Sequence, residues 1–139
     1  MSDITVTAAK VGAIFPDKAE IYDFIAGATI TAGQPVYVAS TGKVSPADAN
    51  ASGKEQVRGI ALNGGGAGQA ISVLKKGHVS GFTLSGAYDS IAYLSDTVGA
   101  LADAAGTMSV PVGRVVPLSD ASLTKVLYVD ARWGGLNWS

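Results

Sequence analysis

The chain has 139 residues, a formal net charge of −1, no cysteine and a charged fraction of only 15%. This length is enough for one domain with its own hydrophobic core, and the absence of cysteine excludes disulfides and thiolate metal sites. The near-neutral charge offers no basic surface to nucleic acid, and the apolar runs are far shorter than the ~20 residues of a membrane helix.

Short strands are predicted along the whole chain. Each is rich in β-branched or aromatic residues, and several alternate apolar and polar residues with a period of two. Clusters of Gly, Asn, Asp and Ser separate the strands and predict turns, one of them at Lys75–Gly77. The predicted strands are 4–7, 20–25, 35–39, 57–62, 70–74, 90–94, 110–118 and 126–131. This spacing is typical of an all-β fold, either a compact β-barrel or a β-sandwich.

Helix signals are weak by comparison. Residues 17–24 have some helical character but also alternate like a strand, and Gly99 interrupts the other candidate at 96–105. We therefore expect at most one short helix.

The two halves of the sequence resemble each other. Residues 36–48 align with 92–104, which places Tyr37 over Tyr93 and Gly42 near Gly99. The alignment continues with 57–62 over 112–118 and with 68–77 over 123–132. Two copies of such a segment predict two β-units packed with pseudo-twofold symmetry.

This repeat suggests how the chain is divided. We expect an N-terminal arm with the first strands at 1–28, a β-barrel domain at 29–131, and an aromatic C-terminal tail at 132–139. Within the domain, the pseudo-repeats cover about 34–77 and 90–131.

The segment Asn63–Gly68, NGGGAG, raises the question of a phosphate-binding loop. A P-loop ends in Gly-Lys-Ser/Thr at the start of a helix, whereas this loop continues into Gln69 and a predicted strand. A dinucleotide-binding fingerprint fails as well, because Gln69 occupies the position of its third glycine. We expect a hairpin turn between 57–62 and 69–74, in which Asn63 and Gly64 supply residues that tolerate positive φ.

His78 is the only histidine and follows the predicted turn at Lys75–Gly77. The sequence contains no G-x-S-x-G elbow, and a lone histidine beside a turn is usually a solvated surface residue. The carboxylates are scattered and form no calcium-loop pattern. We therefore expect no enzyme, no catalytic residue, no cofactor and no metal site.

Aromatic residues near the two ends are the candidates for protein interaction. Trp133 and Trp138 flank a Gly-Gly pair in the tail, and tryptophan is enriched in binding hot spots. Phe15, Tyr22 and Phe24 lie in the N-terminal arm. Each of these side chains either completes the core of its own domain or contacts a neighbouring molecule.

Several segments resemble one family of viral proteins. ITVTAAKVGAIF, AGATITAGQPVYVASTGKVSPADA, RGIALNGGGAGQAISVLKKGHVS, AYLSDTVG and the closing VGRVV and VLYVDA are similar to small capsid decoration proteins of tailed bacteriophages, also called cement or head-stabilising proteins. The similarity covers about residues 1–131 and is most specific in AGATITAGQPVY and GIALNGGGAGQ. It does not extend to the tail RWGGLNWS, which leaves open which terminal arm attaches to the shell.

The resemblance implies a compact β-barrel or β-tulip-like domain that binds the outer face of the expanded phage head. It also implies the major capsid protein as the partner and a homo-oligomer, often a trimer at three-fold positions, with no cofactor, no nucleic acid and no membrane. The first ten residues lack a basic n-region and an apolar h-region, so we expect no signal peptide. The expected location is therefore the outer face of the virion capsid, after synthesis in the host cytoplasm.

Two other classes of function remain open at this stage. One is a module of a phage tail, head fibre or baseplate. The other is a carbohydrate-binding β-sandwich, in which Tyr37, Tyr93 or Trp133 would stack on sugars.

Overall fold

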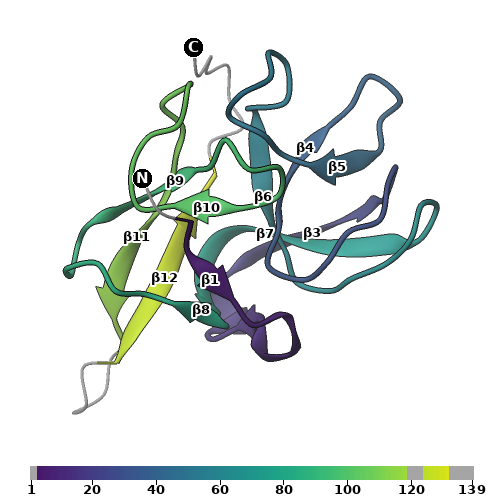
Figure 1. Ribbon diagram of the computed structural model, residues 1–139. Coiled ribbons are helices and arrows are strands. Elements are labelled where there is room, and N and C mark those ends of the chain that lie inside the picture. The colour runs from purple at the N-terminus through teal and green to yellow at the C-terminus, as the bar shows by residue number, and fades with distance from the viewer. Residues whose placement is uncertain (1–2, 119–123, 132–139) are drawn as a thin grey trace.

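A computed structural model describes residues 3–118 and 124–131 and shows an all-β protein (Figure 1). Its strands are β1 (Thr5–Val6), β2 (Gly12–Ala13), β3 (Glu20–Ile25), β4 (Pro35–Val38), β5 (Val44–Pro46), β6 (Val57–Ala61), β7 (Ala70–Ser80), β8 (Phe82–Thr83), β9 (Ile91–Leu94), β10 (Leu101–Ala102), β11 (Pro111–Pro117) and β12 (Lys125–Asp130). The predicted all-β class is confirmed. All eight strands predicted from the sequence are present, and β2, β5, β8 and β10 are additional.

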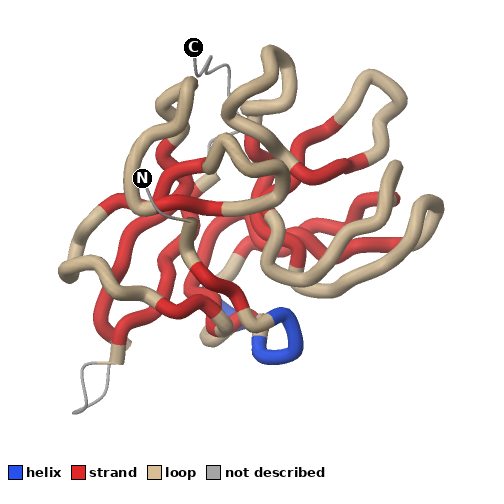
Figure 2. The backbone as a smooth tube through the Cα atoms, viewed as in Figure 1, coloured by secondary structure: helices blue, strands red, loops and turns tan. Residues whose placement is uncertain are grey.

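Helical structure in the described part of the chain is limited to two single 3-10 turns, η1 (Ala8–Lys10) and η2 (Pro16–Lys18) (Figure 2). Neither predicted helical segment forms an α-helix. Residues 20–25 are strand β3, and the segment 96–105 contains β10. At 17–24 the strand-like alternation was thus the stronger signal, and at 96–105 Gly99 interrupts the helical pattern.

Ten strands form one curved antiparallel sheet, a half-barrel, with the order β10-β9-β11-β12-β7-β6-β4-β5. The remaining two strands of this sheet, β2 and β3, pair with the other edge of β7. Lys76 pairs with Asp130 of β12 across one edge of β7 and with Glu20 of β3 across the other edge. A second, small sheet consists of β1 and β8. Residues 5–25, within the predicted N-terminal arm, therefore lie along the sheets.

The strand order is the same in the two predicted units. The first unit has the order β5-β4-β6-β7, the second has the order β10-β9-β11-β12, and the two units join through β12 and β7. A bulge occurs at the same place in each, where Gly59 faces Val36 and Gly113 faces Ala92. A Cβ on either glycine would collide with a carbonyl oxygen of the neighbouring strand, so both positions require glycine. The two pseudo-repeated β-units are therefore present.

Strand β7 carries a bulge that corrects one prediction. The register with β3 passes from Lys76, opposite Glu20, to Leu74, opposite Ile21, and skips Lys75. The turn predicted at Lys75–Gly77 is wrong, because the chain continues as strand through all three residues. Because Lys75 has no partner of its own on β3, Leu74 and Lys76 occupy consecutive positions of the ladder and point to opposite faces of the sheet.

The alternation of side chains along β7 lets it contribute to two hydrophobic clusters. Ile71 and Val73 belong to a smaller cluster with Ala26, Val36 and Val44, all fully buried. Leu74 and Val79 belong to the larger cluster, which fills the space between the two units. Neighbouring residues of one strand thus point into different cores, and this fixes the position of β7 between them.

The glycine-rich segment is a hairpin loop, as predicted, because β6 and β7 pair in antiparallel register around it. In this loop only Gly68 has a positive φ, of 90°, so the turn does not use the tolerance of Asn63 and Gly64 for that conformation. The Asn63 side chain instead closes the loop: its Oδ1 accepts a hydrogen bond from the Ser72 backbone at 2.7 Å, and its Nδ2 donates to the Ala70 carbonyl at 3.2 Å.

Candidate protein-interaction site

Strand β3 exposes large apolar side chains. Ile21, Tyr22 and Ile25 are 38%, 42% and 44% exposed, and we call the face formed by Ile21, Asp23 and Ile25 the β3 surface. Ile21 and Ile25 project from the same face of the strand, because side chains alternate. Between them lies Asp23, whose carboxylate accepts a hydrogen bond from the Ser72 hydroxyl at 3.1 Å. The β3 surface therefore combines two exposed aliphatic side chains with a carboxylate held in place.

The position of β3 in the sheet explains this exposure. Among the described strands, β3 pairs only with β7, so it lies at an edge of the sheet. Directly after β3 the chain turns back to the first unit: Ala26 forms a parallel bridge with Val44, and the Gly27 N–H donates to the Val44 carbonyl at 2.7 Å. This attachment fixes one end of β3 on the sheet, so its surface is a rigid platform.

The aromatic residues predicted to interact occupy different environments. Phe24 is half-buried and packs against the smaller cluster, so it serves the core of its own domain. Tyr22 lies two residues earlier on the same face but is exposed, and its hydroxyl donates to Glu20 at 3.4 Å. Trp133 and Trp138 lie outside the described residues.

Phe15, the remaining predicted residue, belongs to an aromatic row across the sheet. Its ring meets His78 edge-on, with the centroids 5.3 Å apart and the planes at 84°. His78 in turn contacts Tyr128, with the centroids 5.1 Å apart. His78 and Tyr128 are directly opposite each other on β7 and β12, and the Ile14 N–H donates to the His78 carbonyl at 3.0 Å. Phe15 thus packs on its own sheet.

The environment of His78 differs from the solvated turn expected from the sequence, because it lies inside β7 and is half-buried. Burial lowers the pKa of the imidazole, and the Lys18 ammonium lowers it further. Both effects favour the neutral ring in the aromatic row.

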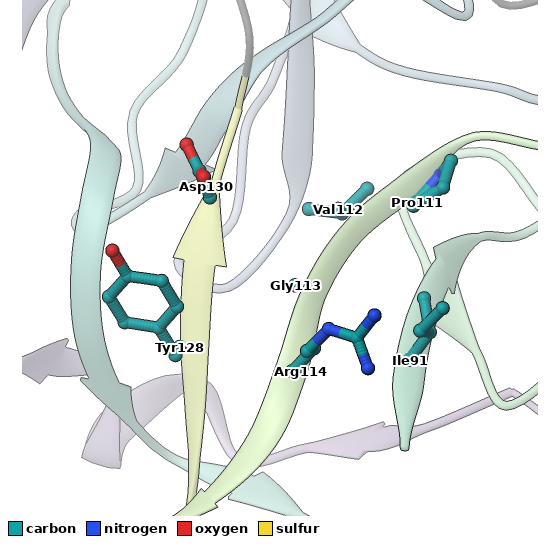
Figure 3. A pocket seen from close by; sticks show the side chains of 7 residues that line it. All are labelled: Ile91, Pro111, Val112, Gly113, Arg114, Tyr128 and Asp130. Atoms are coloured by element: carbon teal, nitrogen blue, oxygen red, sulfur yellow. The ribbon is translucent and has the colours of Figure 1, made fainter. Parts of the chain in front are cut away.

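A pocket of about 270 Å³ lies beside this row (Figure 3). Gly113 and Arg114 of β11 lie between Tyr128 and Asp130 of β12 on one side and Ile91 of β9 on the other. Pro111 and Val112 complete the lining. The pocket rests on three hydrogen-bonded strands, so its walls are held at fixed spacing.

Sequence reasoning missed several residues of both surfaces. Ile21 and Ile25 lie in EIYDFI, which has apolar residues on both faces, and this was a signal that one apolar face would need a cover. Tyr128 and Asp130 lie two residues apart in one strand and therefore share a face. Their proximity to Arg114 depends on the register between β11 and β12, which the sequence does not give.

Comparison with known proteins identifies no relative: the chain matches no protein-family model, and a search of curated proteins finds no match. The part of the chain that the structure describes has no group of three or more His, Asp or Glu side chains able to hold a metal ion. No helix in residues 3–118 and 124–131 is long and apolar enough to cross a membrane.

Proposed function

We propose that this protein is a capsid decoration protein, which binds the outer face of an expanded phage head and stabilises it through non-covalent contacts. The observation that carries the proposal is the β3 surface, where Ile21 and Ile25 are exposed on a rigid edge strand. The resemblance of residues 1–131 to decoration proteins supplies the partner, the major capsid protein, and self-association as a trimer.

The energetics of such a role fit this surface. Burying an aliphatic side chain contributes about 1.5–3 kcal/mol, so a few of them give only a modest affinity for one site. On a symmetric shell the same contact is repeated many times, and a ligand that binds only the expanded lattice stabilises it by mass action. The low charged fraction of 15% suits a surface that is largely covered by protein.

The first test is the copy number of the chain in purified virions, measured against the major capsid protein by quantitative mass spectrometry. A ratio near one to one supports a protein that decorates the whole lattice. A few copies per virion would place it in a tail, fibre or baseplate instead, and its absence from virions would overturn the proposal.

The second test asks whether the β3 surface makes the contact. Ile21→Glu should weaken binding to expanded heads by at least about tenfold, because the new carboxylate would lose its hydration in the interface. The matched control is Val98→Glu, which changes another aliphatic side chain, 57% exposed, in the loop between β9 and β10. Binding is measured by co-sedimentation with heads that lack this protein. Equal binding by both variants would exclude the β3 surface as the attachment site.

A further inference from the structure

We propose that the pocket between β9, β11 and β12 binds a neutral sugar ring, with Tyr128 as the stacking platform and with Asp130 and Arg114 as its polar contacts. This inference goes beyond the proposed capsid role and does not depend on it. The pocket and the β3 surface share no residue.

The orientation of Tyr128 is set before any ligand arrives. His78 packs against its ring, and Phe15 packs edge-on against His78, so the row restricts the ring from the β7 side. The lowered pKa of His78 favours a neutral neighbour for the ring near pH 7. A fixed aromatic ring loses little conformational entropy when it stacks on a ligand, and this favours binding by even a small ligand.

The two charged side chains present complementary polar atoms. The Asp130 carboxylate is exposed and makes no hydrogen bond or ion pair with another described residue, so its lone pairs are available to hydroxyl donors. Arg114 is held by Asp89, where its Nη1 donates to the carbonyl at 2.7 Å and lies 3.6 Å from the carboxylate. A guanidinium has five N–H donors, so others remain for a ligand oxygen.

The mixture of groups selects the class of ligand. Ile91, Pro111 and Val112 add apolar lining, while one carboxylate and one guanidinium leave the pocket without a dominant charge. An anion would be repelled by Asp130 and a cation by Arg114. A neutral pyranose has an apolar face of C–H groups for Tyr128 and hydroxyls that both donate and accept. The volume of about 270 Å³ lies just below the ~300 Å³ at which pockets begin to hold drug-sized ligands, which suits one sugar ring.

The test is a titration of the ¹⁵N-labelled protein with methyl glycosides of glucose, galactose, mannose and N-acetylglucosamine, followed by amide chemical shifts. At least one glycoside should give saturable shifts confined to residues 112–114 and 127–130, with a Kd of about 1 mM as expected for so small a ligand. Absence of saturable shifts with all four would overturn the proposal. Shifts at these residues with a zwitterionic amino acid but with no glycoside would also overturn it.

Variants assign the contacts. Asp130→Asn keeps the shape of an exposed side chain and should weaken binding about tenfold, since a hydrogen bond to a charged acceptor is lost. Tyr128→Leu should abolish measurable binding. The control, Asp17→Asn, changes an exposed carboxylate in η2 outside the pocket and should leave the Kd unchanged. Each amide spectrum shows whether the fold is retained. Unchanged binding by a folded Asp130→Asn protein would exclude the proposed contact.

Discussion

The two β-units use the same strand positions in opposite ways. In the first unit, Pro35, Ile60 and Leu74 form a row across β4, β6 and β7, and all three are buried. In the second unit, the corresponding row across β9, β11 and β12 consists of Ile91, Arg114 and Tyr128, and it lies on the surface. One row fills the core and the other lines a pocket.

The spacing along β7 between its pairing with β6 and its pairing with β12 accounts for this difference. Tyr128 is directly opposite His78, on the face that carries the aromatic row. His78 lies three paired positions beyond Leu74, because Lys75 is the extra residue of the bulge and has no partner of its own on β3. An odd number of positions puts the two side chains on opposite faces, and Leu74 belongs to the larger cluster. This offset between the two units lets one repeated arrangement build both an interior and a binding surface.

Deletion of Lys75 should have the largest effect. It would leave Ile71, Val73, Gly77 and Val79 on their present faces. It would remove the Lys75 carbonyl, which accepts a hydrogen bond from the Ala131 N–H at 2.9 Å, and the bend between the parts of β7 that pair with β6 and with β12, so the chain should lose much of its stability. Lys75→Ala keeps the bulge, and the loss of the contact of its ammonium with Glu20, 3.5 Å away at the surface, should contribute about 0.5–1 kcal/mol. Urea unfolding followed by circular dichroism measures both. A deletion variant as stable as Lys75→Ala would disprove this role of the bulge.

Substitution of the two equivalent glycines should come next. Gly59→Ala places a Cβ against the Leu74 carbonyl oxygen at a φ of +151° and should cost at least ~3 kcal/mol. Gly113→Ala places a Cβ against the Tyr128 carbonyl oxygen and should also be strongly destabilising. Gly53→Ala is the control, because its φ is +87° and no other atom lies within 4 Å, so it should cost only about 1–2 kcal/mol. If Gly59→Ala and Gly53→Ala have equal free energies of unfolding, close strand packing is not the reason that position 59 requires glycine.

Leu74 and Tyr128 occupy equivalent positions in the two rows, so truncating each side chain tests the comparison between the buried row and the surface row. Leu74→Ala should cost about 2–5 kcal/mol, because the side chain is fully buried in the larger cluster. Tyr128→Ala should cost about 1–2 kcal/mol, since the ring is half-exposed and loses chiefly its contact with His78. Chemical denaturation of both variants gives the two values. A larger loss for Tyr128→Ala would contradict the assignment of surface and core.

The pH dependence at His78 should be the smallest effect. The folded state lowers the pKa of His78, so the unfolded chain, with an ordinary value near 6.5, takes up the proton first. The contribution of the neutral ring is therefore fully present above about pH 6.5 and is lost as the pH falls through the folded-state pKa. The drop in melting temperature between pH 7.5 and about pH 5 should be smaller in His78→Gln than in the parent protein. An equal drop would show that His78 does not contribute to this dependence.

The sequence predicted the strands and the repeat because both rest on local patterns. EIYDFI and PVYVA have β-branched and aromatic residues in short runs, and such runs rarely form anything but strands. The alignment of Tyr37 with Tyr93 was also sufficient to place the two units. In the second part of the alignment the register differs, because the structure matches Gly59 with Gly113 at the two bulges.

The bulge and the pocket were not predictable in the same way. Lys75, Lys76 and Gly77 have the composition of a turn, and only the pairing with β3 and β12 keeps them extended. The pocket combines residues from three strands, so it depends on long-range register. The edge position of β3 likewise follows from which strands pair with β7.

The pairing of β12 with β7 also has a consequence for how the chain folds. These strands join the two units, yet four strands, β8 to β11, separate them in the sequence. Closing so long a loop carries an entropic cost before the contacts form, so folding should be slow for a chain of this size. Until β12 pairs with β7, the edge of β7 at residues 76–79 can pair with other chains. Refolding yields should therefore fall as the protein concentration rises.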